Sequence, residues 1–359
     1  MEKKSYLDQY FCNSRINQRV CVCTFQPKHE LVGMKKLLPL LLLFFWATLA
    51  FAQDPIFSQF YAMPLQINPG FAGSARAPRA GLAYRNQWTG FQSAYRTYAA
   101  YYEQSFDRLN SGIGFHVEGD NAGDGIFKTN RFSAVYAYRL KLTDGLALKL
   151  GLEMGVHQVS LNWDKLLFPD QLDAVDGITY NTEEIRPDAT NRADLDISSG
   201  MLLLSDKFYL GVGLKHLNTP SQSILRLKNN LVPGLPIRYT FHGGSEWIVK
   251  KGNKRQEASF VSPNFLFVAQ GPYKQLNVGA YASLGSVFAG TWFRHTFRNS
   301  DAVILLAGFR EGPFKIGISY DATVSGLANQ AGGTFELTLG LIFLNKNRPD
   351  INDCTRMFQ

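Results

Sequence analysis

The sequence has little cysteine, and nearly all of it lies close to the start of the chain. Cys12, Cys21 and Cys23 precede the targeting signal described below, so Cys354 is the one cysteine after that signal. A lone cysteine in an exported chain excludes an internal disulfide framework and a metal cage built from cysteines. Two readings of Cys354 stay open, an unpaired thiol in the tail and an intermolecular bridge.

The common signatures of enzyme chemistry are also missing. The chain has no G-x-S-x-G elbow, no P-loop and no G-x-G-x-x-G loop. The histidines after the signal show no i, i+2 or i, i+4 spacing, which excludes a preformed zinc pair; they are His116, His157, His216, His242 and His295. We expect no catalytic residue, no metal and no cofactor.

Two weaker patterns suggest a catalytic triad and a calcium loop, and for each we favour a purely structural interpretation. Lys149, Glu153 and His157 share the polar face of one predicted strand, where paired or solvated charges are far commoner than a catalytic triad. The stretch "DNAGDG", Asp120–Gly125, partly matches a calcium loop. It lacks an oxygen ligand at Ala122 and a following glutamate, so we predict a glycine-rich hairpin loop.

The charge balance is nearly even once the leader is set aside. Residues 1–52 contain 7 basic and 3 acidic residues, which leaves 30 basic and 26 acidic residues for the rest. The one basic cluster, "KKGNKR" at Lys250–Arg255, reads as a short loop. Neither feature is typical of a protein that binds nucleic acid, so we expect no nucleic-acid partner.

The longest apolar run belongs to a targeting signal. Residues 34–52 have a basic start, Met34-Lys35-Lys36, an apolar stretch and a small-x-small cleavage site, Ala50-Phe51-Ala52. The run is shorter than the roughly 20 residues of a membrane-spanning helix, so we favour a cleaved signal peptide over an uncleaved anchor. Residues 1–33 have no place in this layout, and we expect them to be a gene-start artefact with translation from Met34.

From Arg79 onwards the pattern alternates with period two. In "GLALKLGLEMGVHQ" the leucines share one face, whereas Lys149, Glu153 and several glycines share the other. Such alternation predicts strands with one apolar and one polar face. We expect about 14 strands, at 79–90, 95–106, 111–119, 129–141, 145–161, 192–204, 207–217, 236–250, 257–269, 273–284, 286–297, 302–310, 314–322 and 332–344.

The connections between these segments favour a transmembrane barrel over a soluble sandwich. The segments approach the 9–11 residues of a tilted membrane strand, and long connections alternate with short ones, as extracellular loops alternate with periplasmic turns. We predict an all-β fold, an antiparallel barrel at 79–344 with a periplasmic tail at 345–359. Long outer connections are expected at Asp120–Lys128, Asn162–Asn191, Asn218–Leu235 and Thr323–Ala331. Aromatic residues expected at the membrane interfaces are Trp88, Tyr95, Tyr136, Tyr138, Tyr209, Trp247, Tyr273, Tyr281 and Trp292.

One of these outer connections is acidic. At about 30 residues, Asn162–Asn191 is longer than a connector needs to be. Two interpretations are weighed evenly, a docking site for a secreted partner and a solvated loop. The candidate contact residues are Asp170, Asp173, Asp176, Glu183 and Glu184.

The segment at 53–78, between the signal and the first strand, carries the most specific pattern. It begins "QDPIFSQFYAMPLQINPGFAGS" and leads into "YRNQWTGF". Its prolines are expected to keep it out of both strand and helix, with a turn at Asn68-Pro69-Gly70. Because its aromatic residues are too apolar to hang free, we expect it to pack at the inner mouth of the barrel or to enter the lumen.

These motifs resemble the opening of the PorP/SprF family of outer-membrane proteins of the type IX secretion and gliding-motility system. The closing stretch "SYDATVSGLANQAGGTFELTLGLIF" is similar to the last two strands of that family. Met63 departs from the usual asparagine, and the tail "CTRMFQ" departs from the usual ending, so the resemblance assigns no role to Cys354. The motif residues, taken as candidate partner contacts, are Asp54, Pro55, Phe57, Ser58, Gln59, Pro64, Leu65, Asn68, Pro69, Gly73, Arg85, Asn86, Gln87 and Trp88.

The resemblance implies a non-enzymatic barrel in the outer membrane of a Gram-negative bacterium. Its implied partners are outer-membrane lipids, periplasmic ring lipoproteins of the secretion system and adhesin-like secreted cargo, whose export or surface attachment it would support. Fold analogy alone does not license function. Two alternatives stay open, a diffusion channel or hydrophobic-solute transporter, and a barrel enzyme that acts on lipid or peptide.

Overall fold

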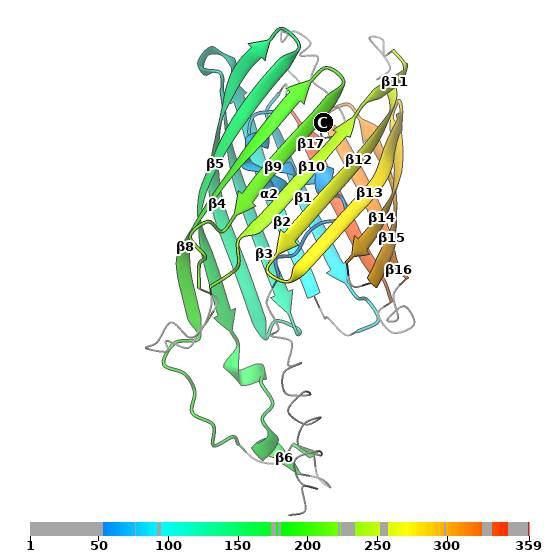
Figure 1. Ribbon diagram of the computed structural model, residues 1–359. Coiled ribbons are helices and arrows are strands. Elements are labelled where there is room, and N and C mark those ends of the chain that lie inside the picture. Colours follow the sequence, from blue (N-terminus) through cyan, green and yellow to red (C-terminus); the bar gives the residue numbers. More distant parts are fainter. Residues whose placement is uncertain are drawn as a thin grey trace, which may run out of the picture. The chain divides into compact units, whose positions relative to one another are not determined.

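In the computed structural model of the chain, the strands close into one antiparallel barrel (Figure 1). No helix among the described residues is long and apolar enough to cross a membrane. The structure describes residues 53–75, 77–91, 95–173, 177–178, 181–221, 223, 234–251, 258–297, 299–324, 332–343 and 358.

Each barrel strand pairs with its neighbours in the sequence, and β1 pairs with β17. The strands are β1 (Arg79–Gln87), β2 (Tyr95–Phe106), β3 (Ser111–Ala122), β4 (Phe127–Thr143), β5 (Leu146–Leu161), β8 (Asn191–Ser205), β9 (Phe208–Lys215), β10 (Arg238–Ser245), β11 (Trp247–Lys250), β12 (Ser259–Gln270), β13 (Tyr273–Leu284), β14 (Val287–Thr296), β15 (Asn299–Glu311), β16 (Phe314–Thr323) and β17 (Thr334–Ile342).

The barrel has fourteen strands because β10 and β11 are two parts of one. Both pair with β12, β10 through Arg238↔Gln270 to Gly244↔Asn264 and β11 through Trp247↔Val261. The β10–β12 pairing closes the sheet. The prediction of an all-β, antiparallel barrel of about 14 strands is confirmed.

The connections differ between the two ends of the barrel. The end that carries 107–110, 144–145, 206–207, 251–258, 285–286 and 312–313 is called here the short-connection end. The long-connection end carries 162–190 and 216–237, and it also carries the tight links 271–272 and 297–298. The expected long connection at Asp120–Lys128 is wrong, because β3 and β4 extend their pairing to Ala122 and Phe127.

The outward face of the barrel is apolar, as a surface in contact with lipid requires. Outward side chains that are exposed to the surroundings include Leu82, Tyr98, Phe115, Phe132, Leu152, Phe241, Val278, Phe293, Leu305, Ile318 and Leu339. Three aromatic residues expected at the interfaces are instead buried inside, Tyr209, Tyr281 and Trp292. Their position in the alternation places them on the inward face. The prediction of an interface position for these three was wrong because it rested on residue type alone.

The inward face surrounds the N-terminal segment (Figure 1). This segment forms three short helical turns, η1 (Phe60–Ala62), α2 (Pro64–Ile67) and η2 (Pro69–Phe71). The expectation that prolines keep it out of any helix is wrong. Pro64 and Pro69 each occupy the first helical position, where the missing N–H costs nothing and the fixed φ suits the turn. The remaining short elements are η3 (Asp107–Leu109), η4 (Trp163–Lys165), η5 (Pro169–Gln171), β6 (Leu172–Asp173) and β7 (Gly177–Ile178).

Candidate functional site: a segment docked in the barrel lumen

The segment from Asp54 to Gly73, called here the lumenal segment, runs lengthwise through the barrel. Its first residue donates a backbone hydrogen bond to Gln270, the last residue of β12 at the long-connection end. Its last residue lies against Gly112, near the start of β3 at the short-connection end. The segment therefore crosses the lumen from one end to the other and does not lie only at a mouth.

Asp54 is the centre of a buried charge cluster. One carboxylate oxygen accepts from Arg131 at 2.9 Å, and the other lies 2.6 Å from His216 Nε2 and 3.2 Å from Arg238. Its side chain is 4% exposed. Burial raises the pKa of Asp54, but the charges of His216, Arg131 and Arg238 outweigh burial and hold that pKa well below its usual range. The carboxylate is therefore the ionised partner of two arginines.

Ser58 and Gln59 form a second polar contact, on the opposite side of the lumen. Both of their backbone N–H groups donate to the Glu336 carboxylate of β17, at 2.8 and 2.9 Å. The Ser58 hydroxyl donates to Asp321 at 2.6 Å and accepts from Arg294. Arg85 of the Arg-Asn-Gln-Trp motif donates to Ile56 O and to Glu336, so it ties the two parts of the motif together.

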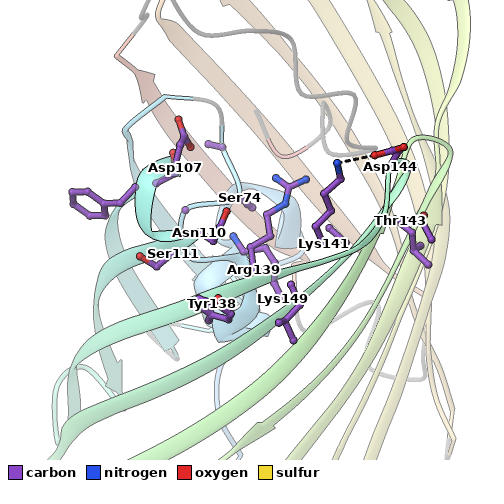
Figure 2. Close-up of a pocket in the computed structure, with 18 of the residues that line it drawn as sticks. Ser74, Asp107, Asn110, Ser111, Tyr138, Arg139, Lys141, Thr143, Asp144 and Lys149 are labelled. Carbon is purple, nitrogen blue, oxygen red and sulfur yellow. Dashed lines mark ion pairs between the residues drawn. The ribbon is translucent and has the colours of Figure 1, made fainter.

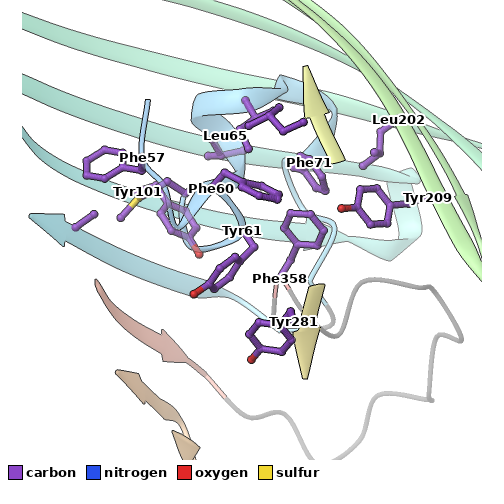
Figure 3. Packing of buried hydrophobic residues seen from close by; sticks show 14 of the residues in the cluster. Phe57, Phe60, Tyr61, Leu65, Phe71, Tyr101, Leu202, Tyr209, Tyr281 and Phe358 are labelled. Atoms are coloured by element: carbon purple, nitrogen blue, oxygen red, sulfur yellow. The ribbon is translucent and has the colours of Figure 1, made fainter. Parts of the chain in front are cut away.

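An aromatic cluster fills the space between these polar groups and the short-connection end (Figure 3). Tyr61 lies 6.0 Å from Trp292 and 5.4 Å from Tyr281, between ring centroids. Phe71 lies 4.6 Å from Phe358 of the tail, whose carbonyl accepts from Arg79. Two residues that are 287 positions apart in the sequence therefore meet inside the barrel.

The barrel wall is shaped to admit the backbone of the segment. A Cβ placed at Gly151 of β5 would collide with Pro69 and Gly70, and a Cβ at Gly200 of β8 would collide with Asn68. Asn68 itself caps η2 through Gly70 N at 2.8 Å and donates to Met201 O at 2.8 Å. The glycines of the inward face thus form a groove in which the segment lies.

The structure brings most of the predicted motif residues together and buries them. Phe57, Ser58, Gln59, Leu65 and Asn68 are at most 1% exposed. In this conformation these residues contact the barrel wall. The buried members of the motif are Phe57, Ser58, Gln59, Pro64, Leu65, Asn68, Pro69 and Arg85, whereas Asp54, Pro55, Gly73, Asn86, Gln87 and Trp88 are half-buried as whole residues.

The end of the second motif lies at the rim of the barrel. Trp88 follows β1 with a positive φ of 59° and packs edge-on against Tyr95 at 5.4 Å. Gln87 accepts a hydrogen bond from Arg85 at 3.2 Å. Asn86 lies on the opposite face of β1 from Arg85 because successive side chains alternate.

The acidic connection 162–190 folds back on itself. The Asp170 carboxylate accepts from Thr182 Oγ1 at 2.9 Å and from Glu183 N at 2.7 Å. This places Asp170 beside Glu183 and Glu184, and all three are exposed. Asp173 is half-buried in β6, and Asp176 lies outside the described residues.

A cavity of about 570 Å³ opens at the short-connection end (Figure 2). It lies between the start of β3, the β4–β5 link and residues 73–75, which lead out of the lumenal segment. Its lining carries both signs of charge and the exposed ion pair Lys141–Asp144 at 2.7 Å. A hydrogen bond from Lys141 lowers the pKa of Asp144.

The residues weighed as a catalytic triad are structural partners in the lumen. Lys149 donates to Ala72 O at 2.7 Å, and Glu153 forms an ion pair with Lys215. His157 is buried on the same face, with its ring 6.3 Å from that of His216. Within the described part of the chain no group of three His, Cys, Asp or Glu residues could hold a metal ion, and Asp120–Gly125 contributes none.

Sequence reasoning missed the wall residues that hold the lumenal segment. Arg131, Arg238, Asp321 and Glu336 are buried and all lie on inward positions of their strands. Their signal was available, because a charged residue at an inward position of a narrow barrel needs a partner inside. What the alternation does not provide is the identity of that partner, here Asp54 and Ser58.

A family model described as "Type IX secretion system membrane protein PorP/SprF" matches residues 49–341. No curated protein matches the chain. Similar solved structures are the Ralstonia pickettii toluene transporter TbuX (8% identity, 79% of this chain and 94% of that chain covered, TM-score 0.44) and the Acinetobacter baumannii outer membrane protein Omp33 (9%, 74% and 98%, 0.41). A Pseudomonas aeruginosa FadL homologue is 12% identical, with 77% and 93% covered and a TM-score of 0.37. At these values the likeness does not extend to function.

Proposed function

The chain belongs to the PorP/SprF family of type IX secretion system membrane proteins, and from this membership we propose that it supports export or surface attachment of adhesin-like cargo. The protein is an outer-membrane barrel of a Gram-negative bacterium. In the proposed role it is not an enzyme. It binds cargo at the long-connection end and periplasmic ring lipoproteins of the secretion system at the short-connection end.

The observation that carries this proposal over a diffusion channel is the occupied lumen. The lumenal segment has partners on strands all around the barrel: β1, β2, β3, β4, β5, β8, β9, β10, β12, β13, β14, β16 and β17. A channel for solutes needs a free path through the lumen. A barrel that keeps its own chain in that path is better suited to a binding role at its two ends.

The cargo-facing surface in this proposal is the acidic connection 162–190. The hydrogen bond from Glu183 N to the Asp170 carboxylate brings the exposed acidic residues Asp170, Glu183 and Glu184 into one part of this connection. Such a patch favours a cargo with a basic face and speeds its encounter through long-range attraction. Asp176 belongs to the same connection and is included on sequence grounds.

The periplasmic surface in this proposal is the rim around the cavity of Figure 2. Residues of three short connections line it, including Asp107, Asp144 and Asp206, together with Ser74 of the chain that leaves the lumen. A lipoprotein bound there would contact both the barrel and the exit of the lumenal segment. Export could then be linked to the state of that segment.

Surface proteomics of the native bacterium tests the proposal. Cells that carry D170N/E183Q/E184Q should lose one or a few large surface proteins released by brief protease shaving, while immunoblots show the normal amount of barrel. D188N changes an exposed carboxylate of the same connection outside the cluster and serves as the matched control. An unchanged surface proteome in a full gene deletion, together with a large steady conductance of the purified protein, would instead establish the channel alternative.

A further inference from the structure

The lumenal segment contacts the wall in the way that a bound peptide contacts its receptor. Several of its backbone carbonyls accept from wall side chains: Arg85 donates to Ile56 O at 2.6 Å, Lys215 to Leu65 O at 3.1 Å and Arg238 to Gln66 O at 2.7 Å. Contacts to main-chain atoms do not depend on the side chains of the segment. They recognise a backbone that is extended at Ile56 and helical at Leu65 and Gln66, and the side chains add the choice of sequence.

The contacts of Asp54 indicate which chemical group the site selects in a bound peptide. Arg238 uses one nitrogen for the Asp54 carboxylate and another for Gln66 O, so both interactions serve the segment. Among the ion pairs of the described residues, Arg238 pairs with Asp54 and with no wall carboxylate. This subsite is therefore built for a carboxylate that arrives with a peptide.

Several other inward charges of the wall have a partner of opposite charge on the wall itself. Inward charges pair within the barrel as Arg79–Glu103, Arg85–Glu336, Arg131–Glu118, Lys215–Glu153 and Arg294–Asp321. An emptied lumen would keep these pairs, whereas the Arg238 guanidinium would lose the Asp54 carboxylate. A buried charge without a partner is costly. The empty barrel is therefore expected to bind another carboxylate at Arg238.

From these contacts we propose that the lumen is a peptide-binding site and that residues 54–73 are its exchangeable resident ligand. The class of ligand is a peptide with an aspartate, an aromatic residue three positions later and a small hydroxyl residue after it, as in Asp54, Phe57 and Ser58. The chain from Gly73 to β1 tethers the resident copy. A tether of this length gives an effective concentration of roughly millimolar, so exchange requires that the tether be cut or the segment be pulled out. This site lies in the lumen, apart from the cargo and lipoprotein surfaces proposed above, and its test measures peptide binding and not export.

The test cuts the tether after folding. A protease-cleavage sequence is inserted after Ala75, which lines the open cavity at the short-connection end. After purification and cleavage, a fluorescent synthetic peptide of residues 53–73 should enter the barrel and displace the cleaved segment. The same peptide with D54N should bind about tenfold or more weakly, because a charge-assisted hydrogen bond contributes about 1.5–3 kcal/mol. Conductance should rise when the cleaved segment is washed out and fall when the unmodified peptide is added.

Two results would overturn the proposal. One is a cleaved segment that never exchanges in a folded barrel, which would make it a fixed part of the wall. The other is equal binding of the unmodified, D54N and scrambled peptides. If the insertion prevents folding, the chain without residues 54–73 is refolded with each peptide in solution. Retention of the unmodified peptide alone supports the site, and retention of none or of all excludes it.

Discussion

Neighbouring residues on β5 face two different environments, and the contrast describes the whole barrel. Leu152 points outward and is 62% exposed, whereas Glu153 points inward, is 3% exposed and pairs with Lys215. The outward face has one requirement, to be apolar, and many residue types meet it. The inward face must match particular partners, so its residues are interpretable only once the lumenal segment is in place.

The largest effect is expected from a charge placed on the outward face. L152R puts a guanidinium near the middle of a lipid-facing strand, which costs about 2–4 kcal/mol. Reversible urea unfolding in lipid vesicles measures the loss of unfolding free energy. I185R, in the long connection where the side chain is already 88% exposed, is the control and should change little. Equal stabilities of L152R and the unmodified protein would mean that this face does not contact lipid.

A smaller and different effect is expected from the inward face. G151A adds a single methyl group where Pro69 and Gly70 approach the wall. Overpacking of this kind costs about 1–3 kcal/mol, and the structure can relieve it by releasing the lumenal segment. We expect the barrel to stay folded while its conductance and the protease sensitivity of residues 54–73 both increase.

Gly340 supplies the matched control for that substitution. It also lies on an inward position, in β17, but its nearest neighbour is Lys315 Cβ at 3.4 Å, which is ordinary contact. G340A should leave conductance and protease sensitivity unchanged. If G151A and G340A behave alike, the glycine groove does not position the segment.

The same contrast explains what the sequence could predict. Alternation is a local property, so the expected segments 95–106 and 273–284 coincide with β2 and β13. The wall partners of the lumenal segment are separated from it by up to 279 residues, as for Gln59 and Thr338, and no local pattern encodes such a pair. Tyr209 and Trp292 were misplaced because residue type was allowed to override position in the alternation.

The short helices of the segment were missed for a related reason. Proline disfavours the interior of a helix, yet at its first position it is favourable. Pro64 and Pro69 take that position because the preceding residues, Met63 and Asn68, leave the helix geometry. The packing of the segment against the wall decides between these two roles, and a sequence without its contacts does not contain that information.

The smallest effect is expected from D54N, which removes the Asp54 carboxylate and leaves the other charges of the lumen in place. Arg131, Arg238 and His216 surround it, with Glu118 and Asp196 beyond them. Its pKa in the folded protein lies well below the usual value of 3.8. A group of this kind contributes its full stabilisation above the unfolded pKa and loses it as the pH falls through the folded pKa.

The lumenal segment should leave the barrel more often in D54N than in the unmodified protein, and this difference should stay constant from pH 8 to about pH 5. It should shrink only below about pH 4, as the carboxylate takes up a proton. Single-barrel conductance across this pH range reports how often the lumenal segment leaves. Both proteins are compared in the H216Q background, which removes the imidazole that lies 2.6 Å from the Asp54 carboxylate. The remaining histidines are common to both proteins. A difference that already shrinks between pH 7 and pH 5 would show that the two arginines do not hold Asp54 ionised, and the lumen would then depend on its aromatic cluster more than on its charges.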